Sequence, residues 1–435
     1  MIRHLAFAVS AAALAIAAAP ALAADAPAMG PWNGGAAKVA EGSPLAKSAL
    51  AFIKLEVAKI GNEALRKATE DAAFNADTCV KHRIGMDEAK KQAILDKLKG
   101  EGLIDETEAG RIPGGLMAGI FPPLRDEASA CPKLPQPYIA APGSVFGGHH
   151  SQPGGLVEHV AVNLTSAMNL ATTYRTVYGT VDAEGRAVMH SGKAGEVADK
   201  AFFIDQDIVL AAPVWHDWAK TIVFQWNADG SEFPEMNFGG NGKTDAWGAA
   251  GSSSKTGAHH IIGVAEAMAR DLPAAEIIAH TSAHNPPNAG NEHTVVNWIR
   301  TASIITGVDP VAKGYLKLDS LNRLRLAPQR KGGEVDIQAS LPNQSNMLYE
   351  YVLHNLSDAD YTYTGTATAQ SELLLRLVAG KFGYDPKDAT KYNTQYRNVA
   401  LSHSGAERIH TLYVNGGLEA VEKEVAKLKA AKVIE

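Results

Sequence analysis

The positions of its histidines constrain this chain more than any other feature of its sequence. Ten of the 15 histidines lie between His149 and His293, and an aspartate directly follows His216. Neutral imidazole is the commonest metal ligand in proteins, and an adjacent carboxylate supplies a hard oxygen ligand. So many ionisable groups are costly to bury unless each one has a partner. The window therefore predicts a site for one or two divalent transition metal ions, and its nitrogen and carboxylate ligands suit Mn, Fe, Co, Ni or Zn.

The first 23 residues have the pattern of a signal peptide. Arg3 precedes an apolar run over 5–19, and Ala21-Leu22-Ala23 has the small residues of a cleavage site. The run is too short and too rich in alanine for a stable membrane-spanning helix, and no later segment is long and apolar enough to cross a membrane. We therefore expect an exported bacterial protein, either periplasmic or extracellular.

The cysteines and the net charge indicate whether the chain holds a disulfide and whether it binds nucleic acid. Cys79 and Cys131 could form one disulfide or remain two separate thiols, and export favours the disulfide. The formal net charge of −6 is mildly acidic and argues against a nucleic-acid-binding surface.

Apolar residues recur with helical periodicity through much of the chain, and strands do not alternate with helices. This pattern favours an all-α fold. We predict helices beginning at the Ser43 cap and over 155–174, 207–226, 258–270 and 294–306, and one after Pro273 that carries His280 and His284 on one face. We also predict a short strand within 332–341 and helices over 366–382 and 418–431. A long polar, glycine-rich stretch over 227–257 could be a binding loop or a disordered insertion.

These patterns divide the chain into five parts. We assign a signal peptide (1–23), an N-terminal helical region (24–131), a Pro- and Gly-rich linker (132–148), a metal-binding core (149–314) and a mostly helical C-terminal extension (315–435).

Three motifs resemble those of the HD superfamily of metal-dependent phosphohydrolases. Residues 149–159, His-His-Ser-Gln-Pro-Gly-Gly-Leu-Val-Glu-His, are similar to the HH-x3-GGL-x2-H opening of the family. Residues 216–220, His-Asp-Trp-Ala-Lys, resemble its HD-x-x-K core, and residues 257–261, Gly-Ala-His-His-Ile, resemble its later GH-I element. The resemblance spans residues 149–309 and implies an HD-domain-like helical bundle with additional helical extensions at both ends.

The resemblance also implies roles for individual residues. The implied metal ligands are His159, His216, Asp217, His260, His280 and His284, and Asp217 would bridge two ions. It implies catalytic roles for Asp217 and Lys220, and substrate contacts for His149, His150 and Lys220. Lys220 would hold a phosphate as a point charge, or would be an ordinary solvated lysine. Structural roles remain the alternative for His260 and His280, and we expect His259 to be the exposed member of its pair.

One position departs from the family pattern. Members close the site with an aspartate about twenty residues after the last histidine, and Ser303 occupies that place by helix register. The nearest acid, Asp309, is about 9 Å further along a helix axis. We therefore predict that Asp309 does not reach the metal and that Ser303 faces the site.

The resemblance implies hydrolysis of a small phosphate mono- or diester by a metal-activated water. Two alternatives stay open. One is an HD-like di-iron oxygenase, which a His-rich two-metal site would also suit. The other is a non-catalytic periplasmic binding or sensor protein with a degenerate site, which Ser303 would favour.

Overall fold

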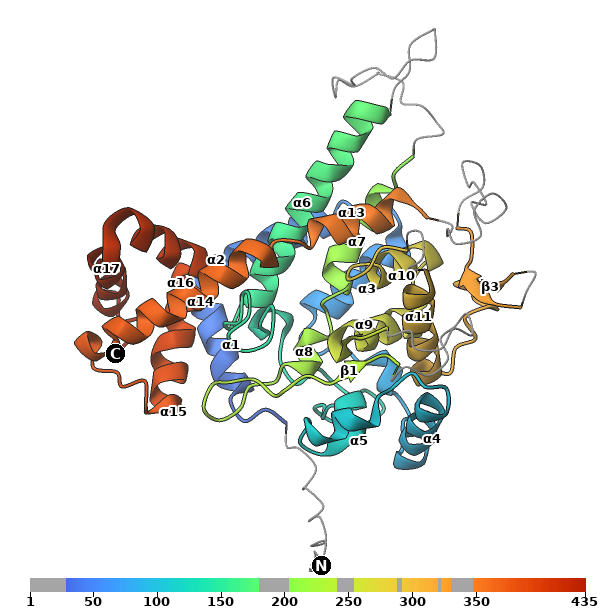
Figure 1. Ribbon diagram of the computed structural model, residues 1–435, viewed down its shortest axis with the longest axis horizontal. Helices are drawn as coiled ribbons and strands as arrows, with labels where there is room; N and C mark the ends of the chain where they lie inside the picture. Colours follow the sequence, from blue (N-terminus) through green and yellow to red (C-terminus); the bar gives the residue numbers. More distant parts are fainter. Residues whose placement is uncertain (1–28, 180–202, 241–253, 288–291, 320–321, 330–346) are drawn as a thin grey trace, which may run out of the picture.

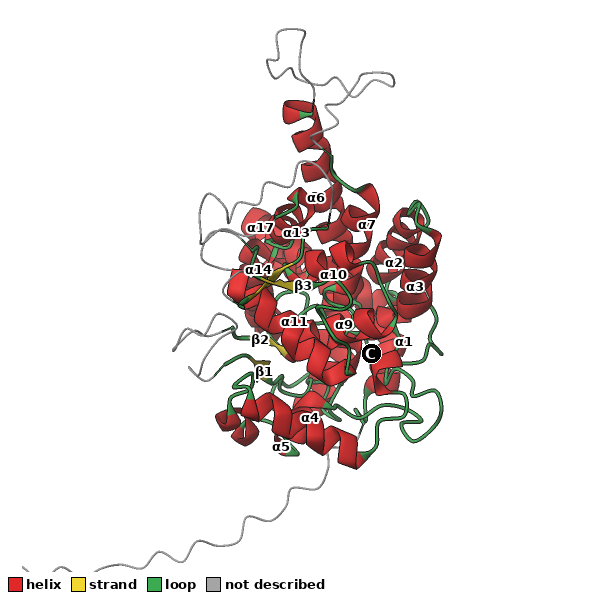
Figure 2. Ribbon diagram, turned by 90° about the vertical axis from the view of Figure 1, so that its right-hand side faces the viewer, coloured by secondary structure: helices red, strands yellow, loops and turns green. Residues whose placement is uncertain are grey.

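The computed structural model describes residues 29–179, 203–240, 254–287, 292–319, 322–329 and 347–435. It confirms the all-α prediction (Figures 1 and 2). Strands form only two short antiparallel pairs among these residues: β1 (Asn237–Phe238) with β2 (Thr256–Gly257), and β3 (Leu316–Leu318) with β4 (Leu324–Leu326). The predicted signal peptide and the predicted strand within 332–341 lie outside the described residues.

The helices account for most of the described chain. In order they are α1 (Asn33–Gly42), α2 (Pro44–Val57), α3 (Glu63–Phe74), α4 (Glu88–Gly100), α5 (Gly115–Ile120), α6 (Gly155–Tyr178), α7 (Gln206–Trp215), α8 (Lys220–Val223), α9 (Ala258–Ala269), α10 (Ala274–Thr281), α11 (Glu292–Thr306), α13 (Tyr349–Ser357), α14 (Tyr361–Val378), α15 (Ala389–Tyr392), α16 (Asn398–Ser404) and α17 (Ala406–Ala430). None of the described helices is both long and apolar enough to cross a membrane.

Several helix ends follow the local signals in the sequence. The Ser43 hydroxyl accepts a hydrogen bond from the backbone N–H of Ala46 at 3.1 Å and caps α2, with Pro44 at the first helical position. Gly307 has a φ of 71° directly after α11, a conformation that favours glycine, so the helix ends where the sequence predicts. Local chemistry therefore decides these boundaries.

Two predicted helices end earlier than expected. The single helix predicted over 207–226 is α7 and α8, separated by a turn at His216 and Asp217 in which Lys220 N–H donates to the Asp217 carbonyl at 2.9 Å. The helix carrying His280 ends at Thr281, so His280 and His284 do not share one helix face. The hydroxyls of Thr281 and Ser282 donate to carbonyls four residues back, and such bonds compete with continuation of the helix.

One large apolar core joins the N-terminal helices to the histidine window. Residues such as Ile53 and Leu98 belong to the same buried cluster as Leu156, Trp215 and Ile261. The tryptophans flanking the His-Asp turn are fully buried, and their indole N–H groups donate to Thr69 and Ala72 of α3. The N-terminal helical region therefore supports the turn that carries His216 and Asp217.

A second, smaller core holds the C-terminal helices together. It is built from residues of α14, α16 and α17, which lie at one end of the molecule (Figure 1). Helix α14 begins earlier than the predicted 366, and α17 extends the predicted terminal helix back to Ala406 across a kink at Gly417. The α13–α14 junction connects this unit to the larger core, because α13 packs against α6, α7 and α10.

Cys79 and Cys131 form a disulfide, and their Cα atoms lie 4.9 Å apart. The bond ties the segment after α3 to the start of the predicted linker, where Cys79 also forms a bridge pair with Lys133. The predicted disulfide is therefore present, and both of its cysteines belong to the N-terminal helical region.

Candidate metal centre

The histidine window encloses a cavity of about 390 Å³. Its polar base contains His149, His159, Asp217, His259 and His284. These residues come from the segment before α6, from α6 itself, from the α7–α8 turn, from α9 and from the segment after α10. Residues of the α13–α14 junction complete the wall.

Side-chain atoms of His159, His216, Asp217 and Asp358 converge at the base of this cavity. Nε2 of His159 lies 3.1 Å from Asp217 Oδ2 and 3.0 Å from Asp358 Oδ1. Nε2 of His216 lies 3.4 Å from the same oxygen of Asp217 and 3.2 Å from the same oxygen of Asp358. We call these four residues the first ligand group.

The spacing and burial of this group fit a metal ion. With metal–ligand bonds of about 2.1 Å, neighbouring ligands in octahedral or tetrahedral sites lie roughly 3.0–3.4 Å apart. Both ring nitrogens of His216 and Oδ1 of Asp217 are buried without a hydrogen-bond partner among the described residues. Unpartnered buried polar atoms are costly, and a bound cation would satisfy them.

The electrostatics of the first ligand group favour a bound cation. Burial alone would oppose charge on His216, but Asp217 and Asp358 raise its pKa to about 9. Burial would likewise raise the pKa of Asp217, yet His216 and Lys220 hold it well below its usual range. The carboxylates of the group thus stay ionised. Without a metal ion, protons on its imidazoles supply the positive charge that balances them.

A second ligand group uses the other oxygen of Asp217. Asp217, His259 and His284 each offer a ligand atom within 4.8 Å of the others, and His259 Nε2 lies 3.5 Å from Asp217 Oδ1. Nδ1 of His259 pairs with Glu235 at 2.5 Å, and Nδ1 of His284 with the Thr256 hydroxyl at 3.1 Å. Partners of this kind fix the orientation of a metal-binding imidazole and leave its second nitrogen free for the ion. Asp217 therefore presents one carboxylate oxygen to each ligand group.

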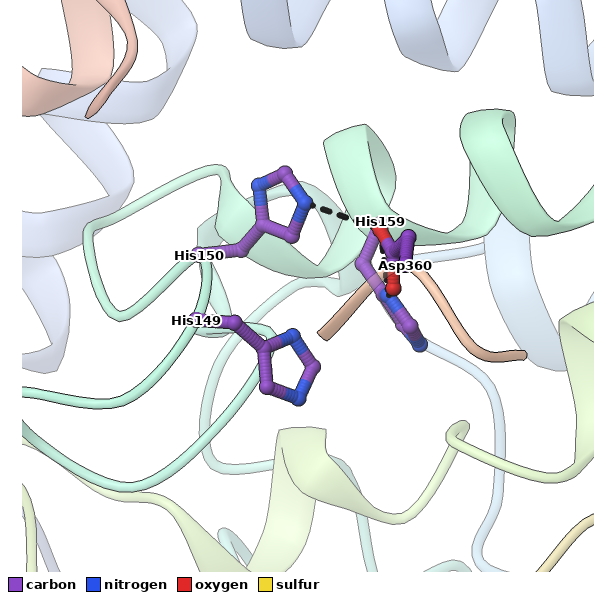
Figure 3. Close-up of side chains that lie close together, drawn as sticks. All are labelled: His149, His150, His159 and Asp360. Carbon is purple, nitrogen blue, oxygen red and sulfur yellow. Dashed lines mark hydrogen bonds and ion pairs between the residues drawn. The ribbon is translucent and has the colours of Figure 1, made fainter. Parts of the chain in front are cut away.

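His149, His150, His159 and Asp360 form a third cluster, which shares His159 with the first ligand group (Figure 3). Oδ1 of Asp360 lies 3.1 Å from Nδ1 of His159, which leaves Nε2 of that ring for the first ligand group. His150 is buried between Asp360, 3.1 Å away, and Glu158, 3.8 Å away. Burial opposes its charge, but these two carboxylates raise the pKa of His150 to about 9. His150 therefore balances negative charge on Asp360 and Glu158.

His149 and His150 have different surroundings. His149 lines the cavity, and its Nδ1 is buried with no hydrogen-bond partner among the described atoms. Burial first, and then His159, lower the pKa of His149 to about 2, so its ring is neutral. Of the two predicted substrate contacts, the structure places His149 at the cavity wall and His150 behind it.

The paired glycines of the GGL motif have a steric role. A Cβ at Gly155 would overlap the carbonyl oxygen of His150, and Gly154 has a φ of 89°, a conformation that favours glycine. The loop that carries the two histidines can therefore lie directly against the first turn of α6, which holds His159.

Lys220 is not a solvated lysine. Its ammonium donates at 2.5 Å both to Asp217 Oδ2 and to the carbonyl of Gly143, and the side chain is buried at the cavity wall. The lysine therefore holds the Asp217 carboxylate in place.

His260 and His280 lie outside both ligand groups. Nδ1 of His260 pairs with the Thr256 hydroxyl, and Nδ1 of His280 lies 3.2 Å from Glu276. His259, expected to be exposed, is buried, because Glu235 accepts from both its backbone N–H and its ring. That anchor sets the register of the first turn of α9 and turns His259 toward Asp217.

The prediction that Ser303 faces the site is wrong. Its hydroxyl lies 3.7 Å from the sulfur of Met268, and Ser303 and Asp309 line a separate cavity. The second carboxylate of the first ligand group is Asp358, which follows the last residue of α13. Counting helix register after His284 missed it because the chain passes through β3, β4 and residues 330–346 before α13 begins.

His354 is a further buried histidine that the sequence reasoning missed. Its ring centroid lies 4.8 Å from that of His216, and neither ring nitrogen has a hydrogen-bond partner among the described residues. The spacing His354-x3-Asp358-x-Asp360 at the end of a helix was the available signal for this segment.

No protein-family model, curated protein or solved structure matches this chain.

Proposed function

We propose that this protein is an HD-type metal-dependent phosphohydrolase that cleaves a small phosphate mono- or diester. The observation that carries the proposal is the use of both oxygens of Asp217. Oδ2 faces His159 and His216, and Oδ1 faces His259. A carboxylate shared by two clusters of imidazoles suits paired divalent ions, an arrangement common to enzymes of phosphate ester hydrolysis.

Bound divalent ions would supply Lewis-acid activation of water and positive charge for the phosphoryl oxygens. The chain's own residues position that chemistry. Lys220 holds the Asp217 carboxylate, Asp360 orients the ring of His159, and Glu235 orients that of His259. His149, neutral and facing the cavity, is placed to donate a hydrogen bond to a phosphate or to its leaving group.

The presence of Asp358 weakens the case for a degenerate binding protein. That alternative depended on a missing carboxylate, and Asp358 Oδ1 lies within 3.2 Å of both His159 and His216. Export remains part of the proposal, supported by the N-terminal sequence pattern and by the disulfide.

Metal analysis combined with activity assays tests the proposal. The purified protein should release phosphate from generic mono- or diesters when loaded with Mn, Fe, Co, Ni or Zn, and should contain up to two ions per chain. His216→Ala should lose the ion of the first ligand group and abolish phosphate release while the helical circular dichroism signal is retained. Two irons with oxygen consumption and no phosphate release would instead identify an oxygenase.

A further inference from the structure

We propose that the substrate carries an uncharged ring-bearing group, which packs on Leu356 and Tyr361 at the mouth of the metal cavity. This inference rests on the proposed phosphohydrolase function and adds the class of the group that is attached to the phosphate.

The cavity has an apolar rim above its polar base. Val145, Leu356 and Tyr361 line the same cavity as His159 and Asp217, yet they are 45 %, 48 % and 54 % exposed. Large apolar side chains that are grouped and exposed beside a polar site mark a surface for ligand contact. A tyrosine ring offers an apolar face for stacking on another ring.

The rim is held in place by the same short segment that supplies the carboxylates. Asp358 and Asp360 pair with His159 on either side of its ring. Leu356 precedes them and Tyr361 follows them, and the Asn355 side chain donates to the carbonyl of Ala283 at 2.5 Å. The Tyr361 ring centroid lies 6.2 Å from that of His149. Leu356 and Tyr361 therefore lie at a fixed place relative to the first ligand group.

The charges around the cavity oppose a second anionic group on the substrate. Among the described lining residues Lys220 is the only lysine or arginine, and its ammonium is engaged by Asp217 and Gly143. Glu235 adds a carboxylate to the same wall. A substrate with a carboxylate or a further phosphate at the rim would find no free cation among these residues, so the rim selects an uncharged group.

Esters with similar leaving groups separate this recognition from intrinsic reactivity. The probes are 2-phenylethyl phosphate, ethyl phosphate and 2-carboxyethyl phosphate, all alkyl esters. We expect kcat/KM of the metal-loaded enzyme to be about tenfold higher for the phenylethyl ester than for the ethyl ester, and lowest for the carboxyethyl ester. Tyr361→Ala should reduce the preference for the ring at least threefold. Tyr363→Ala is the matched control, because Tyr363 is similarly exposed on α14 but does not line the cavity.

Calorimetric binding of 2-phenylethylphosphonate and ethylphosphonate gives a second readout that does not depend on turnover. Tighter binding of the phenylethyl compound, lost in Tyr361→Ala and kept in Tyr363→Ala, supports the proposal. Equal affinities, or a preference unaffected by Tyr361→Ala, overturn it even if the enzyme hydrolyses every ester. If no ester is hydrolysed, the proposed function fails, and the phosphonate affinities still decide the question of the ring.

Discussion

Oδ1 of Asp358 lies 3.0 Å from Nε2 of His159, and this pair closes the first ligand group. Asp358→Asn should therefore remove the ion held by this group, because a neutral amide is a much weaker ligand than a carboxylate. Metal analysis after dialysis should show about one ion fewer per chain, with activity reduced at least a hundredfold. Asp309→Asn is the control, since Asp309 lines a different cavity, and it should keep the full metal content. The opposite result for the two variants would give the closing role to Asp309, against both the structure and the sequence-based prediction.

The second ligand group makes a separate prediction about the adjacent histidines of α9. His259→Ala should lose the second ion, because its Nε2 faces Asp217 Oδ1. His260→Ala should keep both ions and mainly lower stability, because His260 is buried against Trp298 and pairs with Thr256. Metal content and thermal melting of the two variants check this. If His260→Ala loses an ion and His259→Ala does not, the assignment of α9 is reversed.

Metal binding should release protons. In the metal-free protein the pKa of His216 is raised to about 9, and that of His159 is raised well above its usual value. Below about pH 9 an incoming ion must therefore displace a proton from His216, so apparent affinity should fall as pH is lowered. Calorimetry at pH 7 in two buffers of different ionisation enthalpy should report about one to two protons released per ion at the first ligand group. Equal heats in the two buffers would contradict the shifted pKa values.

Glu266 should contribute to acid sensitivity away from the metal centre. It is fully buried and accepts hydrogen bonds from the backbone of Lys81 and His82 and from Arg270. Burial alone would raise its pKa, but His82 and Arg270 lower it to about 2. Because the folded pKa is below the unfolded one, its stabilisation is complete above about pH 4.5 and is lost as pH falls toward 2.

Glu266→Gln tests this contribution. The free energy of unfolding of the variant should be about 3 kcal/mol lower than that of the parent protein at pH 7, because a buried charge partner has been removed. The difference should shrink as pH approaches 2, as measured by urea denaturation across pH. A difference that stays constant with pH would show that the pKa of Glu266 is not lowered in the folded protein.

The disulfide should contribute to stability but not to metal binding. Replacing both Cys79 and Cys131 with alanine should lower the free energy of unfolding by about 2–4 kcal/mol. The metal content of the folded variant should be unchanged, because the bond lies in the N-terminal region. Reduction of the disulfide in the parent protein should lower the free energy of unfolding by a similar amount.

Local patterns were enough for much of the fold. Helical periodicity, the Ser43 cap and the glycine after α11 act over one or two turns, so they can be interpreted without neighbours in space. The resemblance of three short motifs to the HD superfamily also implied that His159, His216 and Asp217 lie together, and the structure brings their ligand atoms within 4.8 Å of one another.

The remaining ligands depended on contacts between distant segments. The choice of His259 over His260 follows from Glu235, and the closing carboxylate is Asp358, brought to His159 by the packing of α13 against α6. Neither outcome follows from periodicity, since both adjacent histidines are buried and they differ in their partners, Glu235 for His259 and Thr256 for His260. The sequence by itself therefore determined an all-α chain with a His-Asp centre. Only the tertiary structure decided which residues complete that centre, because burial and ion pairing are properties of segments that meet in space.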